Sequence, residues 1–288
     1  MRKVLAAALF AACHPAKPAP PPAPIAVPIA PADAGVAADP ARIAWERRDA
    51  DPAALDQAIA LFEDEALRTA GPAGKLLGAA RARRERMRRT ERRTDLDPAD
   101  TARSQAEDAQ ACAADARRSW AAQFPAAAAE ADRRPPPELF TQIGPAGADA
   151  LYLDAVCSAA WARLQGFTPL IERRVELLAA LLRVAQIAPD LDGAGPDREL
   201  GALLAALPPY AGGDLSEARK HLEDAVRRAP ADFRNRVVLA RTVAVKSQDR
   251  GLFEEQLRAV LKGDDAASVA EATALLQRED DLFGDAGH

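Results

Sequence analysis

The stretch from Glu199 to Lys262 constrains the fold of this chain more than any other, because it contains an internal repeat. Residues that favour turns divide it into four short segments, each of which favours a helix. The repeated apolar stripe consists of Ala218, Leu222 and Ala225 in one copy and of Phe253, Leu257 and Val260 in the next. A recurrence at roughly 34 residues predicts stacked helical hairpins, none of which buries its apolar face alone.

Composition supports a fold made only of helices. Aromatic residues form 5% of the chain, β-branched residues are few, and no segment alternates in the manner of a strand. Ala218, Leu222, Ala225 and Pro230 also match the small, large, small and breaker positions of a tetratricopeptide second helix. We therefore predict an all-α, tetratricopeptide-like solenoid of helical hairpins, that is, an α-α superhelix.

The first 40 residues are predicted to contain targeting and linker segments. Arg2 and Lys3 precede an apolar run and then small residues before Cys13, which resembles the lipobox of bacterial lipoproteins. We expect a signal peptide at residues 1–12, lipidation of Cys13, and a Pro/Ala-rich linker at 13–40. The residue that follows Cys13 is His14 and not aspartate, which predicts sorting to the outer membrane. The alternative is an ordinary secretory signal with an incidental cysteine.

Residues 41–288 are predicted to form the helical domain. Cap residues, breakers and apolar periodicity place helices after Asp51-Pro52, at 73–93, from Asp97-Pro98 to 125, at 148–164, from Thr168-Pro169 to 187, and from Asp264 or Asp265 to 278, in addition to those of the repeat. Asp214 is the expected cap of the helix that follows the Gly212-Gly213 turn.

One basic run, RARRERMRRTERR, lies in the helix predicted at 73–93. It either contacts an anionic surface or partner, or forms a solvated helix face while Leu76, Leu77 and Met87 point inward. The solvated face is favoured. Across the chain, 38 basic and 43 acidic residues are well mixed, and the net charge of −5 gives no reason to expect a nucleic-acid partner.

The C-terminal half resembles a known family. The matching features are Gly195-Pro196, Leu200-Gly201, Leu207-Pro208, Gly212-Gly213-Asp214-Leu215 with Ala218-Arg219, and Gln248-Asp249 before Phe253. Together they resemble the T component associated with TRAP transporters, a family of tetratricopeptide-like periplasmic lipoproteins. The resemblance covers residues 150–262 most closely.

That resemblance implies a partner, a ligand and an assembly. The partner is the periplasmic solute-binding protein of the transporter, the ligand is a hydrophobic small molecule held in an apolar channel, and the assembly is a homotrimer. Side-chain type and turn position suggest the residues that would line the channel: Tyr210, Leu200, Leu203, Leu204, Leu207, Trp161 and Phe167. For the leucines, Trp161 and Phe167, ordinary core packing is the alternative, and for Tyr210 it is packing at a turn.

Cys112 and Cys157 are the thiols that remain after lipidation of Cys13. In an oxidising periplasm they form a disulfide between neighbouring helices, or else they are two separately buried small residues. Nothing in the sequence sets the distance between them.

The sequence contains no motif of an enzyme, a cofactor site or a metal site. Asp190, Asp192 and Asp197 surround Gly193, but their spacing differs from that of a calcium loop, so caps and turns explain them better. His221 is expected to be a solvent-facing residue of a repeat helix. We therefore predict no enzyme, no cofactor and no metal.

Two functions remain. The first is an auxiliary T component that binds a hydrophobic ligand and docks a solute-binding protein. The second is an adaptor lipoprotein whose repeats bind an envelope protein and no small ligand.

Overall fold

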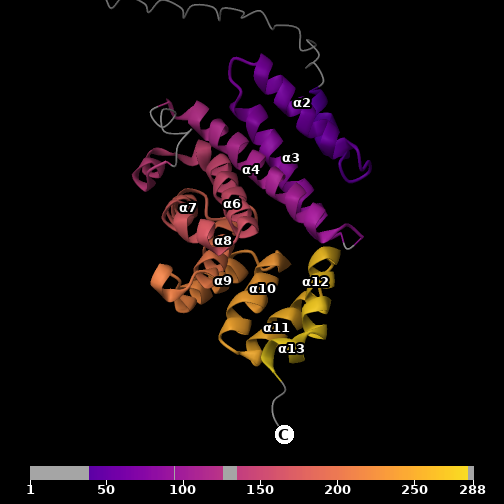
Figure 1. The fold of residues 1–288 in the computed structure, drawn as a ribbon, viewed down its shortest axis with the longest axis vertical. Helices are drawn as coiled ribbons and strands as arrows, with labels where there is room; N and C mark the ends of the chain where they lie inside the picture. The colour runs from indigo at the N-terminus through magenta and orange to yellow at the C-terminus, as the bar shows by residue number, and fades with distance from the viewer. Residues whose placement is uncertain (1–38, 94, 126–134, 285–288) are drawn as a thin grey trace, which may run out of the picture. The chain divides into compact units, whose positions relative to one another are not determined.

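The structure, a computed structural model, describes residues 39–93, 95–125 and 135–284. Residues 39–288 form one compact unit, and its described part is helical and without strands (Figure 1). The all-α prediction is therefore confirmed. Within the described ranges, no helix is both long enough and apolar enough to cross a membrane. Residues 1–12, Cys13 and most of the predicted 13–40 linker lie outside the described residues.

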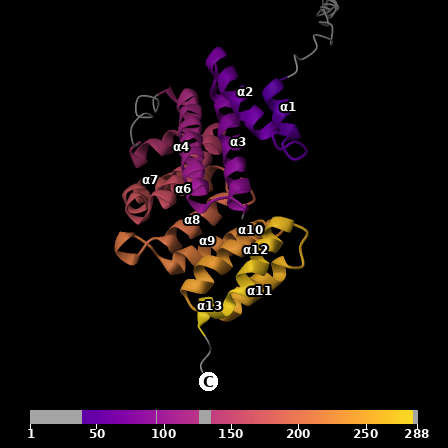
Figure 2. The same ribbon diagram turned by 45° about the vertical axis from the view of Figure 1, so that its right-hand side comes forward.

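The first helices of the unit are α1 (Pro40–Arg47), α2 (Ala54–Arg68), α3 (Ala73–Glu91) and α4 (Pro98–Gln123). Each packs against the next in sequence, and Figure 2 shows α1 beside α2. Asp97 caps α4, because its carboxylate accepts hydrogen bonds from the amides of Ala99 and Asp100. The order of packing follows the order of the chain.

The central helices are α6 (Ala148–Gln165), α7 (Phe167–Ile187) and α8 (Gly195–Ala206), preceded by the short 3-10 helices η1 (Pro137–Gln142) and η2 (Pro145–Gly147). α6 is buried on nearly every side, because α4 packs on one side of it and α7 on another. Helix α7 starts at Phe167, one residue before the predicted Thr168-Pro169 start. The reason is that Gly166, at φ +113°, turns the chain directly out of α6.

The last part contains η3 (Pro209–Ala211), α9 (Leu215–Arg228), α10 (Phe233–Leu239), the π-helical turn η4 (Ala240–Ala244), α11 (Arg250–Val260), α12 (Ala266–Gln277) and α13 (Glu279–Phe283). Both copies of the repeated apolar stripe are fully buried: Ala218, Leu222 and Ala225 on α9, and Phe253, Leu257 and Val260 on α11. The repeat thus has the same burial pattern in both copies.

Two glycines allow close approaches that a side chain would prevent. A Cβ at Gly201 would lie 2.5 Å from Leu222 Cγ. The backbone of α8 therefore packs directly against a side chain of α9. A Cβ at Gly213 would lie 1.9 Å from the carbonyl oxygen of Leu207, which the chain passes as it turns back. Asp214 then caps α9 by accepting hydrogen bonds from Ser216 and Glu217.

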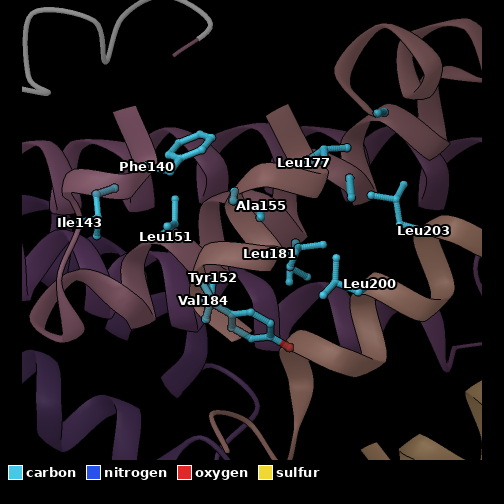
Figure 3. Packing of buried hydrophobic residues seen from close by; sticks show 14 of the residues in the cluster. Phe140, Ile143, Leu151, Tyr152, Ala155, Leu177, Leu181, Val184, Leu200 and Leu203 are labelled. Carbon is cyan, nitrogen blue, oxygen red and sulfur yellow. The ribbon is translucent and has the colours of Figure 1, made fainter. Parts of the chain in front are cut away.

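The largest apolar core lies between α4, α6, α7 and α8 (Figure 3). Leu151 comes from α6, Leu181 from α7 and Leu200 from α8, and each is at most 1% exposed. The indole NH of Trp120, which is also fully buried, donates to Asp154 at 3.0 Å. Arg117 binds the same carboxylate at 2.9 Å and 3.0 Å, so the polar groups inside this core are paired.

A disulfide joins α4 to α6 beside this core. The Sγ atoms of Cys112 and Cys157 are 1.99 Å apart, their Cα atoms are 5.9 Å apart, and 45 positions separate them in sequence. Both residues are completely buried. The bond therefore closes a covalent loop around the connection between two helices of the core.

Reduction of this disulfide should lower the free energy of unfolding by about 2–4 kcal/mol, because a loop of this length strongly restricts the unfolded chain. The measurement is urea unfolding of the wild type with and without reductant. The double variant Cys112→Ala/Cys157→Ala is the control, because reductant should not shift its midpoint. An identical wild-type midpoint in both conditions would contradict the expectation.

Candidate functional site

Four of the seven predicted ligand residues belong to the central core. Leu200 and Leu203 are fully buried and Leu207 is 4% exposed, and Figure 3 shows Leu200 beside Leu181. Trp161 is half-buried against the same core, with the guanidinium of Arg173 4.7 Å from its ring centre. These side chains pack against the core and do not line either pocket described below.

The other three predicted residues lie elsewhere. Leu204 packs against a second apolar cluster, between α8, α9 and α10. Phe167, at the start of α7, is 49% exposed, and Tyr210, in η3 after α8, is 82% exposed. None of the seven lines either of the two pockets described next.

The first pocket has a volume of about 430 Å³ and is lined from α1, α3, α6 and the loop before α8. Helix α3 contributes Arg81, Arg84, Glu85 and Arg88, which are spaced so that they share one face of the helix. Helix α6 contributes Asp149, Tyr152 and Leu153 at the same spacing, and Trp45 and Arg48 close the pocket from α1. We call this space the arginine pocket.

A second pocket, of about 580 Å³, lies between α1, α2 and α3. Its wall mixes Phe62 and glycines of α3 with the charged groups of Arg42 and Lys75. Lys75 bridges Asp39 at 2.6 Å and Glu65 at 2.5 Å, so its charge is already balanced. Trp45 and Arg81 line both pockets and form the wall between them.

At the edge of the arginine pocket, Asp192 holds four elements together. Its carboxylate accepts hydrogen bonds from the Tyr152 hydroxyl (2.9 Å), from Arg198 (2.8 Å) and from Arg234 (2.9 Å), and a longer one from Arg88 (3.3 Å). These partners come from α6, α8, α10 and α3. The residue itself sits at φ +50°, in a turn that points the side chain into the junction.

The electrostatics of this junction favour an ionised carboxylate. Burial would raise the pKa of Asp192, but the guanidinium groups of Arg198, Arg234 and Arg88 outweigh it and hold the pKa well below its usual range. Burial raises the pKa of the Tyr152 hydroxyl, which therefore stays neutral and able to donate. At neutral pH the junction is therefore a network of ion pairs with Asp192 ionised.

The arginines of the basic run in α3 bind acidic and carbonyl groups of several neighbouring elements. Arg83 and Arg86 reach Asp108 on α4, whereas Arg89 binds Asp49 and the Arg48 carbonyl between α1 and α2. The Arg83 and Arg84 side chains are only 15% and 14% exposed. The prediction of a solvated basic face is therefore wrong for these residues, although Leu76 and Met87 are buried as predicted.

His221 also differs from its prediction. Its side chain is 25% exposed, and Nδ1 lies 2.9 Å from Asp197 Oδ1. This hydrogen bond raises the pKa of His221. The charged pair therefore stabilises the fold below the ordinary histidine pKa, and this contribution is lost as the pH rises through the raised value.

The described residues contain no group of three or more histidine, cysteine, aspartate or glutamate side chains that could hold a metal ion. Sequence reasoning missed the arginine pocket and the role of Asp192. The helical spacing of Arg81, Arg84, Glu85 and Arg88 was visible, but nothing in the sequence placed α1 and α6 opposite that face.

We expect a large loss of stability when the carboxylate of Asp192 is replaced by an amide. Asp192→Asn should lower the free energy of unfolding by about 3 kcal/mol, because the buried Arg198 and the partly buried Arg88 and Arg234 lose their shared anion. Asparagine tolerates positive φ, so the backbone is not the cause. Since the pKa of Asp192 is depressed, the difference from wild type should be full above about pH 4 and shrink as the pH falls further.

The matched control for this variant is Asp190→Asn, two residues away. Asp190 is 80% exposed and makes one ion pair, 3.4 Å from Arg228, so its loss should change stability by less than about 0.5 kcal/mol. Urea unfolding of both variants at several pH values is the measurement. Equal effects at the two positions would show that Asp192 does not organise the junction.

Comparison with known proteins identifies the family. The profile described as the TRAP transporter T-component matches residues 79–283, well over half of the chain. The match runs from inside α3 to α13 and includes both paired cysteines and Asp192. No curated protein matches the chain. The profile describes an auxiliary part of a transporter and not an enzyme. The chain therefore belongs to the TRAP transporter T-component family.

Proposed function

We propose that this protein is a lipid-anchored periplasmic T component that holds a hydrophobic small ligand and docks the solute-binding protein of a TRAP transporter. The observation that carries the proposal is the family match over residues 79–283. This region contains the repeat and the central core, which are the parts of the chain from which sequence reasoning derived the function.

We also propose a tetratricopeptide-like solenoid. Consecutive helices pack against one another from α1 to α12, as stacked hairpins do. The second helices of two successive hairpins, α9 and α11, bury equivalent stripes. Both features support the proposed architecture.

The membrane anchor is proposed to be the lipid on Cys13, followed by the linker at 13–40 and attached to the outer membrane. Cys13→Ser should move the protein from the membrane fraction to the soluble fraction, because no described helix could span the bilayer instead. Fractionation and intact-mass measurement of both forms test this. If the serine variant stays in the membrane fraction, the anchor is not Cys13.

The apolar ligand is proposed to enter at the end of the α7–α8 pair. Phe167 begins α7 and Tyr210 follows α8, and both are exposed, whereas Leu203 and Leu207 of α8 and its C-terminal cap are buried in the core. Their exposure on a single chain leaves apolar surface that a ligand, the solute-binding protein or another protomer of the proposed homotrimer would cover.

Native mass spectrometry of residues 39–288, which form a compact unit, tests ligand and assembly together. We expect a trimer with extra mass that organic solvent removes, and a larger complex when the solute-binding protein is added. The variant Phe167→Ser/Tyr210→Ser should lose the extra mass. Leu67→Ser, at a residue 81% exposed on α2, is the control and should retain it.

A bare monomer would contradict ligand holding and favour the second candidate, an adaptor that binds a protein alone. One observation favours that candidate: none of the seven predicted ligand residues lines either described pocket. A bare chain that still binds an envelope protein would establish it.

A further inference from the structure

We propose that the arginine pocket binds a small organic anion, through its carboxylate or phosphate group, against an apolar wall. This inference is independent of the hydrophobic ligand proposed above, because the two sites share no residue. The pocket also includes Trp45 and Arg48, which precede the matched region 79–283.

Basic side chains outnumber acidic ones in the lining of the arginine pocket. The lining contains Arg48, Arg81, Arg84 and Arg88, which face three carboxylates. Asp149 binds Arg81, Glu85 binds Arg89 at 2.8 Å, and Asp192 is shared with two further arginines, Arg198 and Arg234. The three carboxylates are therefore committed, and Arg48 and Arg84 have only distant partners outside the lining, Asp49 at 3.7 Å and Glu199 at 3.6 Å.

Arg84 is only weakly paired with carboxylates. Its side chain is 14% exposed, and its single ion pair is long, 3.6 Å from Nη2 to Glu199 Oε1. Glu199 also lies 3.8 Å from Arg198 Nε, and the buried Nε of Arg84 has no hydrogen-bond partner among the described residues. A guanidinium so poorly paired, at the wall of a pocket, has donors to offer an oxyanion.

Arg88 stands one helical turn from Arg84 on the same face. Its one described carboxylate contact is the 3.3 Å approach to Asp192. Burial lowers the pKa of Arg88, and the charges of Arg84 and Arg234 lower it further against the attraction of Asp192. A bound anion would relieve this repulsion between neighbouring cations.

The remaining wall defines the rest of the ligand. Trp45, Leu153 and Leu191 are apolar, and Arg48 stacks on the Trp45 ring at 4.1 Å, which holds the indole in place. A volume of about 430 Å³ suits a small molecule. The chemistry that fits is an anionic head beside Arg84 and Arg88 with a compact apolar body.

The test uses the full-length protein and isothermal titration calorimetry with benzoate, its neutral isostere benzamide, and inorganic phosphate. We expect benzoate to bind and benzamide to fail, because both fill the same space but only one carries charge. Competition by phosphate would show that the pocket recognises oxyanions in general, and no competition would show preference for a carboxylate with an apolar body. Each of these results supports the site.

Variants locate the binding. Arg88→Gln should weaken benzoate about tenfold or more, and Arg84→Lys should weaken it less, because lysine keeps the charge and loses the planar fork. Arg92→Gln, at an exposed residue that ends the same helix, is the control and should bind as wild type does. Thermal unfolding checks that each variant is folded.

Three results would overturn the proposal. One is the absence of heat from both benzoate and phosphate at up to ~10 mM. Another is equal binding of benzoate and benzamide, which would remove the role of charge without the need for any variant. The third is unchanged benzoate affinity in folded Arg88→Gln and Arg84→Lys proteins, which would place binding elsewhere.

Discussion

One shared carboxylate, that of Asp192, links four helices of the unit. Helices packed in chain order contact mainly their sequence neighbours, so few interactions tie distant elements together. Asp192 does so, because donors from α3, α6, α8 and α10 converge on it. A partly buried network of this kind adds little net stability compared with an apolar contact, whereas loss of its shared anion is costly. The junction therefore matters most as a link between these helices.

The same junction forms one wall of the arginine pocket. Arg88 and Tyr152 contact Asp192 and also line the pocket, so the network holds that wall in place. Trp45 lines the same space from α1.

Local signals in the sequence predicted most of the fold, whereas the pocket depended on distant contacts. Asp97 and Asp214 act as predicted caps, because capping needs only the three following residues. The start of α7 was missed because the chain turns at Gly166, so that the helix begins at Phe167, one residue before Thr168-Pro169. The basic run was misread because burial of Arg83 and Arg84 depends on α4 and α8, whose positions no local pattern encodes.

The bond between Cys112 and Cys157 has a consequence for how the chain tolerates change. The connection from α4 to η1 includes the alanine-rich residues 126–134. The disulfide links α4 to α6 independently of that connection. A protease that cut the chain between the two cysteines would therefore leave the two helices covalently attached.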